Sequence, residues 1–207
     1  MTDEQALPPR FDDRARRELL HQRALVLDGV LDDDNGALLM TQLIQLAADD
    51  PRDDIALWIH SPGGSVPAML AIRDLMRLVP CDVATLDLGM ACSAGQFLLS
   101  AGAAGKRRAL PHAKVLLHQG SSGIGGTAVD VEMQADDLRR MRDTVLGIIA
   151  DDTGQPRERV FEDSLRDHWF TAEEALDYGF IDAIATDLDE LLPRHRRRTG
   201  LAGEAAR

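Results

Sequence analysis

Lysine and cysteine are both scarce in this chain of 207 residues. Only two of the 23 basic residues, Lys106 and Lys114, are lysines, and the rest are arginines. The two cysteines, Cys81 and Cys92, provide neither a disulfide framework nor a metal site with the usual ligand spacing. These absences exclude a fold held together by disulfides and leave few lysines that could act as a catalytic base.

Long apolar runs, a secretory signal and a basic net charge are missing as well. No uninterrupted apolar segment approaches the roughly 20 residues that a membrane-spanning helix needs. The chain begins with the polar and acidic residues Met1–Gln5 and shows no apolar signal core. The formal net charge of −12 argues against a general nucleic-acid-binding protein. We therefore expect a cytoplasmic protein that binds neither nucleic acid nor a membrane.

The chain does contain a regular alternation of strand-like and helix-like segments. The strand-like runs lie at 24–27, 55–59, 83–88, 115–118 and 180–185. Such β-α alternation predicts a mostly parallel, layered α/β fold with right-handed crossovers. We expect one domain over residues 19–192, preceded by a mobile N-terminal arm at 1–18 and followed by a disordered C-terminal tail at 193–207.

The alternation changes after His118. The segment Gly120–Gly126 contains four glycines and is too glycine-rich for a core strand. A long amphipathic helix then begins at Thr127, with Asp130 in its first turn, and ends at Gly154. A ribbon and a long helix inserted at about 119–150 predict a protruding handle that reaches another subunit. A helical hairpin that packs on the same domain is the alternative.

Ser93 lies at a predicted strand-to-helix corner among small residues, in the segment Gly89–Gln96. The first N–H groups of a helix have no internal partner, and the helix dipole favours negative charge there. An attacking hydroxyl and the oxyanion that it creates both need such an environment. The same position also suits a serine that only begins a helix.

A serine nucleophile needs a base, and the sequence offers few candidates. Lys106 lies in a turn-like segment and Lys114 begins a strand, so neither is in desolvated surroundings. Histidine is the usual base. Of the six histidines, His118 ends an apolar strand, where α/β enzymes commonly place catalytic side chains. His60, which borders a glycine motif, is the second candidate.

Asp167 and Gly64 are the candidates for the remaining catalytic roles. Asp167 lies in a predicted connection and is followed by Trp169 and Phe170, which could shield it from water, whereas most other acids lie on predicted helix faces. Gly64 ends the motif Ser61–Gly64 after a strand, so its N–H could face an oxyanion; a tight turn is the alternative. No Gly-Lys-Ser/Thr sequence follows, so the motif is not a phosphate-binding loop.

Four motifs occur in a characteristic order and spacing. They are Leu57–Gly64 (LWIHSPGG), Gly89–Gly95 (GMACSAG), Leu116–Gln119 (LLHQ), and the stretch from Arg166-Asp167 through Thr171–Ala175 (TAEEA) to Tyr178–Asp182 (YGFID). Each motif alone is weak, but the four together resemble the proteolytic subunit of the Clp protease family. The resemblance runs from about Leu19 to Leu192.

This resemblance implies a crotonase-like α/β fold with a protruding strand-helix handle, and a serine peptidase with the triad Ser93, His118 and Asp167. The backbone N–H groups of Gly64 and Ala94 would form the oxyanion hole. The resemblance implies no metal and no cofactor on this chain. It further implies two stacked heptameric rings that cut unfolded proteins in an inner chamber. A Clp-type AAA+ unfoldase, which uses ATP on its own subunits, would supply the substrate.

The sequence departs from the family pattern at several positions. In the family pattern a proline usually follows the His-Gln pair, but this chain has Gly120 there. Ala56 replaces an aromatic residue that is often used for unfoldase docking. Leu165 occupies a position that is often acidic and pairs across the rings with the arginine matching Arg166. These departures predict a subunit of mixed rings. The alternatives are a non-catalytic or conditionally active ring subunit and a crotonase-type acyl-CoA hydratase or isomerase, whose usual acid/base is glutamate.

Overall fold

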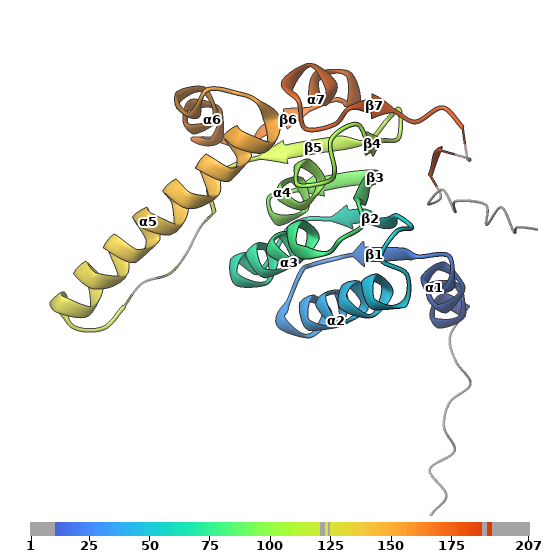
Figure 1. Cartoon of the computed structure of the whole chain (residues 1–207). Coiled ribbons are helices and arrows are strands. Elements are labelled where there is room, and N and C mark those ends of the chain that lie inside the picture. Colours follow the sequence, from blue (N-terminus) through green and yellow to red (C-terminus); the bar gives the residue numbers. More distant parts are fainter. Residues whose placement is uncertain (1–10, 121–122, 124, 188–189, 192–207) are drawn as a thin grey trace, which may run out of the picture.

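The computed structural model describes residues 11–120, 123, 125–187, 190 and 191 (Figure 1). The helices are α1 (Phe11–His21), α2 (Asp33–Asp49), α3 (Val66–Leu78), α4 (Ala94–Ser100), α5 (Ala128–Thr153), α6 (Arg157–Ser164) and α7 (Ala172–Tyr178). The strands are β1 (Ala24–Asp28), β2 (Ile55–Ser61), β3 (Val83–Cys92), β4 (Arg107–Ala109), β5 (Lys114–Leu117), β6 (His168–Phe170) and β7 (Ala183–Ile184). Strands and helices alternate, so the predicted α/β class is confirmed.

A single sheet joins these strands, and it divides along β3. The strands β1-β2-β3-β4-β7 are parallel neighbours in this order. β3 is long and pairs with two different strands along the same edge. Its residues 85–87 pair with β4, and its residues 90–92 pair with β5. Its register against β2 shifts between Ile59 and Ser61. The C-terminal end of β3 therefore opens toward β5, and β5 pairs with β6 in the antiparallel direction.

The helices that follow the first three strands bury their apolar faces in one core. α2, α3 and α4 stand in the same order as β1, β2 and β3 (Figure 1). Leu43 of α2, Ile72 of α3 and Leu98 of α4 are all completely buried. Burial of each such side chain contributes about 1.5–3 kcal/mol. The core thus fixes the position of the corner between β3 and α4.

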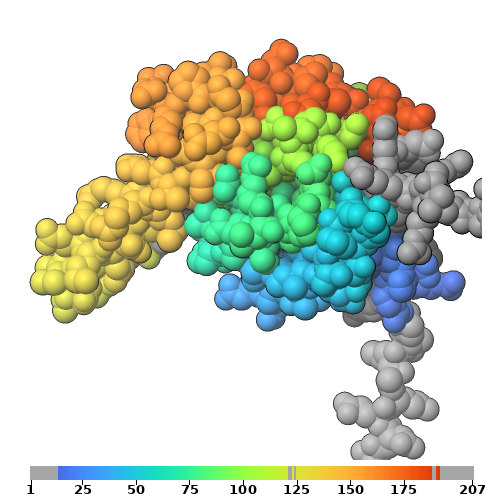
Figure 2. All heavy atoms as spheres, in the orientation of Figure 1, coloured from blue at the N-terminus to red at the C-terminus, as the bar shows by residue number. Residues whose placement is uncertain are grey.

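The long helix α5 projects from the body of the protein (Figures 1 and 2). Its buried residues lie only in its second half, from Leu146 to Ala150, whereas Val129 and Met133 near its start are exposed. The helix therefore leaves the domain as predicted for a handle and does not pack along it as a hairpin would. The described residues between Leu117 and α5 form no strand, so the structure describes only the helical part of the handle.

Several short elements differ from the sequence-based expectation. α1 begins at Phe11, inside the segment 1–18 that was expected to be a mobile arm; residues 1–10 and the expected tail at 193–207 lie outside the described residues. β4 and β6 form where the sequence predicted a turn and a connection. Each has only three residues and pairs with a partner that is distant in sequence, so no local periodicity could reveal it. β7 spans two residues instead of 180–185.

Candidate active site

Ser93 occupies the corner between β3 and α4 in an uncommon backbone conformation. Its φ of 52° and ψ of −113° lie outside the regions that side-chain-bearing residues favour. The Ser93 hydroxyl makes no capping hydrogen bond to α4. Strain of this kind persists only where the surrounding structure enforces it, and it is concentrated at functional sites. The corner therefore presents a hydroxyl that the fold does not use for its own support.

The antiparallel pairing of β5 with β6 brings the predicted base and acid together. Leu117 pairs with His168, so the next residues outward, His118 and Asp167, lie opposite each other. The distance from His118 Nδ1 to Asp167 Oδ1 is 3.4 Å. This arrangement allows the carboxylate to hold the imidazole through Nδ1 and leaves Nε2 for a serine. The expected aromatic shield is wrong, because the Asp167 side chain is 68 % exposed.

Ser93 and His118 line the same cavity, which has a volume of about 360 Å³. Its walls come from α3, α4, α5 and the segment after β5. The Ser93 N–H donates to the carbonyl of Leu116 over 3.0 Å, which ties the serine backbone to the strand that carries His118. Among the described residues, however, no hydrogen bond joins the Ser93 hydroxyl to the His118 imidazole. The serine and the base thus share one cavity, and the described residues show no hydrogen bond between their side chains.

Two glycines lie against this corner. A side chain at Gly63 would bring its Cβ to 2.7 Å from Ser93 Cβ. A Cβ at Gly64, where φ is +148°, would overlap the carbonyl oxygen of Leu31, with which Gly64 forms a parallel bridge. The bridge uses the carbonyl of Gly63 and the N–H of Ser65. Within the described chain, the N–H groups of Gly64 and Ala94 accordingly have no hydrogen-bond acceptor, as an oxyanion hole requires.

The second candidate base, His60, does not line this cavity. It is exposed at the end of β2, and its Nδ1 would lie 3.4 Å from a Cβ built at Gly89. The structure therefore separates His60 from the cavity that contains Ser93 and leaves His118 as the histidine that shares it.

Sequence reasoning missed the buried carboxyl group of Asp87, six residues before Ser93. Its side chain is inaccessible to solvent. Oδ1 accepts a hydrogen bond from the Gly89 N–H over 2.8 Å, while Oδ2 has no partner among the described residues. Burial raises the pKa of Asp87 to about 7. The signal in the sequence was a single acid inside an otherwise apolar strand.

Cys92 is buried next to Ser93 and is a poor competitor for the nucleophile's role. Burial, together with the nearby charges of Asp87 and Asp167, raises the pKa of its thiol to about 11. Because the thiolate is the reactive form of cysteine, Cys92 is chemically inert at neutral pH. This agrees with its interpretation as a small buried neighbour.

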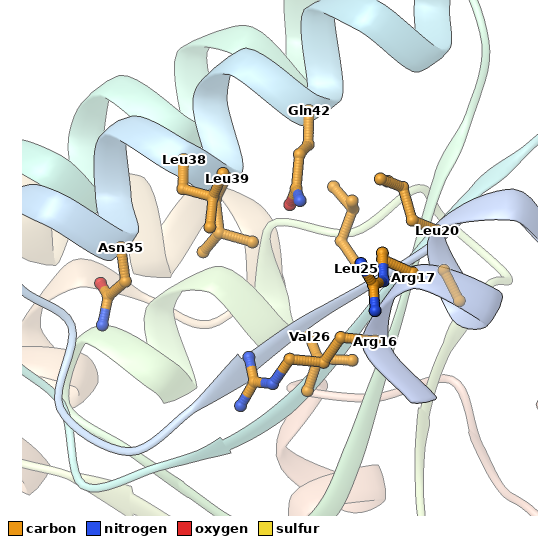
Figure 3. Close-up of a pocket in the computed structure, with 10 residues that line it drawn as sticks. Arg16, Arg17, Leu20, Leu25, Val26, Asn35, Leu38, Leu39 and Gln42 are labelled. Carbon is orange, nitrogen blue, oxygen red and sulfur yellow. The ribbon is translucent and has the colours of Figure 1, made fainter. Parts of the chain in front are cut away.

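A second cavity of about 370 Å³ lies between α1, β1 and α2 (Figure 3). Its lining combines apolar side chains with Arg16 and Arg17 and includes no serine, histidine or cysteine. It therefore lacks a nucleophile. Elsewhere in the described parts of the chain, no three histidine, cysteine, aspartate or glutamate side chains gather as metal ligands do. Nor does any described helix combine the length and apolar character needed to cross a membrane.

Comparison with known proteins decides the family. The family model described as Clp protease matches residues 10–187. This chain belongs to the Clp protease family. The family consists of serine peptidases, so the sequence-based resemblance is confirmed. Membership also favours a peptidase over the alternative of an acyl-CoA hydratase or isomerase.

Curated relatives match this chain over most of its length. The ATP-dependent Clp protease proteolytic subunit 1 of Streptomyces avermitilis is 50 % identical over 195 residues, which are 94 % of this chain and 90 % of the relative. Subunit 3 of Streptomyces coelicolor is 51 % identical over 193 residues, 93 % of this chain and 89 % of the relative. Subunit 1 of Corynebacterium jeikeium is 47 % identical over 182 residues, 88 % of this chain and 97 % of the relative.

Proposed function

We propose that this chain is a serine endopeptidase subunit of an ATP-dependent Clp protease, with Ser93, His118 and Asp167 as its triad. The register between β5 and β6 carries this proposal, because it places Asp167 3.4 Å from His118 beside the cavity that also contains Ser93. The N–H groups of Gly64 and Ala94 are the proposed oxyanion hole. The chemistry requires no metal or cofactor on this chain.

The proposed reaction is acyl transfer in two steps. His118 Nε2 accepts the proton of the Ser93 hydroxyl while Ser93 Oγ attacks the carbonyl carbon of a peptide bond. Gly64 and Ala94 donate hydrogen bonds to the oxyanion, and the imidazolium returns its proton to the departing amine. Water then hydrolyses the acyl-enzyme with His118 again acting as the base. Asp167 holds the imidazole and stabilises its charge throughout.

We further propose that the active form is two stacked heptameric rings, located in the cytoplasm, that enclose a chamber for unfolded polypeptides. A Clp-type AAA+ unfoldase would deliver these substrates and consume the ATP, in line with the names of the relatives. Several large apolar side chains are exposed on the described chain, among them Leu38, Leu78 and Val129. Exposed apolar side chains of this size are suited to contacts between subunits.

A second candidate is a subunit that is active only in a mixed assembly. The Ser93 hydroxyl makes no hydrogen bond to His118 within the described chain, and the Asp167 side chain is largely exposed. Leu165, at a position where the family pattern is often acidic, is 55 % exposed and offers no charge for Arg166 of a facing ring. The relatives' names number their subunits, which fits a family with more than one kind of subunit.

A fluorophosphonate probe tests both candidates, because it modifies an activated serine covalently. We expect one adduct, located on Ser93 by peptide mass spectrometry, that Ser93→Ala abolishes. His118→Ala should slow the labelling by about a thousandfold or more. Ser65→Ala, which removes a nearby hydroxyl that does not line the cavity, is the matched control and should still be labelled.

The probe is applied to the full chain alone and together with other Clp subunits. Labelling of the chain alone, with peptide cleavage, supports the first candidate, and labelling only in the presence of another subunit supports the second. No labelling in any assembly would refute the proposed triad. Native mass spectrometry of an active homotetradecamer would refute the requirement for mixed rings.

A further inference from the structure

The carboxylate of Asp167 has little direct support from the rest of the chain. Its partner is His118 Nδ1, at 3.4 Å, and no other described side chain bonds to it. Asp167 is instead held by the backbone on either side of it. That backbone joins the end of α6 at Ser164 to the start of β6 at His168 over residues 165–167. What fixes these two ends therefore decides where Asp167 lies.

Ser164, the last residue of α6, is bonded twice to the residue that follows His118. Its carbonyl accepts a hydrogen bond from the Gln119 N–H over 2.8 Å. Its hydroxyl accepts one from Gln119 Nε2 over 3.2 Å and donates its own proton to the Phe161 carbonyl over 2.8 Å. Ser164 is buried, so these bonds are shielded from water. The end of α6 is thereby fixed relative to the segment that carries His118.

Asp163, the preceding residue, contacts the residue that follows Asp167. Its Oδ1 lies 3.5 Å from His168 Nδ1. The His168 ring stacks on Phe170 of the same strand, with the ring centroids 4.2 Å apart. Asp163 Oδ2 accepts a hydrogen bond from the Tyr178 hydroxyl over 3.0 Å. One carboxylate therefore connects α6 with the start of β6 and with α7.

Tyr178 anchors the Asp163 carboxylate to the core. The tyrosine is buried, and its ring stacks on Phe180 with the centroids 4.6 Å apart. Burial and the Asp163 carboxylate raise the pKa of the phenol above its usual value, so the hydroxyl keeps the proton that it donates. Arg159 Nε also lies 3.5 Å from Asp163 Oδ2, but the arginine side chain is 57 % exposed, so water screens its charge. The buried hydroxyl is thus the fixed partner of Asp163.

We propose that Asp163 is a positioning residue of the enzyme, which holds the start of β6 so that Asp167 stays opposite His118. This inference rests on the proposed function. Because the same helix end is bonded to Gln119, Asp163 places the acid relative to the base. Asp163 does not line the cavity that contains Ser93, so it acts through Asp167 and does not contact the substrate.

The test is a double-mutant cycle on fluorophosphonate labelling of the assembled full chain, compared at equal oligomer content by mass photometry. We expect Asp163→Ala to slow the labelling of Ser93 about tenfold to 100-fold, the range for displacing a reacting group by up to about 1 Å. In protein that already carries Asp167→Ala, the same substitution should slow labelling less than about twofold. A residue that acts through Asp167 has no further effect once that carboxylate is gone. Equal slowing in both backgrounds would indicate a general structural role and overturn the proposal.

Two further variants separate the loss of the hydrogen bond from the loss of charge. Asp163→Asn keeps an oxygen that accepts from the Tyr178 hydroxyl, so its labelling rate should stay within about threefold of the wild-type rate. Glu162→Ala removes the same charge at the exposed neighbouring residue and should change the rate less than about twofold. The proposal fails if Asp163→Asn is labelled as slowly as Asp163→Ala, or if Glu162→Ala has the same effect.

Amide hydrogen exchange separates this proposal from the proposed function, because it requires no activity. We expect Asp163→Ala, but not Glu162→Ala, to speed exchange about fivefold to tenfold in the peptide that contains β6, the range of one lost hydrogen bond. If the wild-type protein is not labelled at Ser93 but exchange in β6 rises in Asp163→Ala alone, the peptidase proposal fails and the positioning of β6 by Asp163 stands. If labelling succeeds and the double-mutant cycle shows no coupling, only the role of Asp163 is refuted.

Discussion

Gly63 packs against Ser93 so closely that any side chain there would displace the serine. Its φ is +109°, a conformation that favours glycine, and an added Cβ would lie 2.7 Å from Ser93 Cβ. We expect Gly63→Ala to slow fluorophosphonate labelling of Ser93 by about 100-fold, the cost of displacing a reacting group by about 1 Å. Gly125→Ala is the control, because a Cβ at Gly125 meets no atom within 4 Å. An unchanged labelling rate in Gly63→Ala would show that the corner accommodates the added methyl group without displacing Ser93.

The buried carboxyl group of Asp87 should make the stability of the protein depend on pH. Its pKa is raised by burial from 3.8 to about 7, so the folded state favours the protonated form. This contribution to stability is complete below pH 3.8 and is lost as the pH rises toward 7. The loss amounts to about 4 kcal/mol at roughly 1.4 kcal/mol per pKa unit.

Asp87→Asn removes the titration and keeps an oxygen for the Gly89 N–H. We therefore expect the variant to gain stability relative to the wild type between pH 5 and pH 8, measured by urea unfolding at several pH values. Asp74→Asn, at an exposed aspartate of α3, is the matched control. A stability difference between Asp87→Asn and the wild type that stays constant over this range would contradict the raised pKa.

The sequence identified candidate residues one by one, but it did not show how they would contact one another. Ser93 and His118 follow strand-like runs, and the pattern of small residues around Ser93 indicated a corner. Asp167 was selected by its place in a connection, but the sequence could not show why it meets His118. That contact depends on the pairing of β5 with β6, about 50 residues apart in the chain. Asp87 was missed because strand periodicity says nothing about an acid enclosed on both faces.

At the scale of elements, prediction succeeded where a segment is long and periodic. The helix from Thr127 to Gly154 was placed correctly, because its capping box and its terminal glycine are local signals. The strands β4 and β6 have three residues each and depend on long-range partners, so no local pattern identifies them. α1 was missed because its charged sequence lies next to two prolines, which suggested an arm.

The N-terminal cap of α5 supports the part of the handle that stands free of the domain. Thr127 accepts a hydrogen bond from the Asp130 N–H, and Asp130 accepts one from the Thr127 N–H. Hydrogen bonds from Thr127 hold the pKa of Asp130 below its usual value. Because that pKa is depressed, the contribution of Asp130 is present above pH 3.8 and is lost as the pH falls further.

We expect Thr127→Ala to destabilise the first turns of α5 by about 1 kcal/mol, measured as faster amide hydrogen exchange there at neutral pH. Thr144→Ala is the control on the same helix. Thr144 donates back to the carbonyl of Arg140 within the helix, so its removal should leave exchange unchanged or slow it slightly. Equal effects of the two substitutions would show that the cap does not support the handle.

The site in one chain is incomplete in a specific way. His118 and Asp167 lie within 3.4 Å of each other and two backbone donors are free, but among the described residues no hydrogen bond joins the serine hydroxyl to the imidazole. The side chain of Asp167 is 68 % exposed, so water screens its charge. Leu165 and Trp169, on either side of Asp167 in sequence, are exposed as well. A second subunit that covers this surface would remove water from the acid and restrict the imidazole.

Activity should therefore depend on assembly, and dilution provides the test. We expect the rate of fluorophosphonate labelling per chain to fall at least tenfold as the protein is diluted from intact rings to single chains, with mass photometry reporting the oligomer in the same samples. The reason is that a single chain spends little time with the Ser93 hydroxyl bonded to His118. Rings that are chemically cross-linked before dilution are the control and should keep their labelling rate, because their contacts survive. Single chains that are labelled as fast as intact rings would show that one chain aligns its own triad.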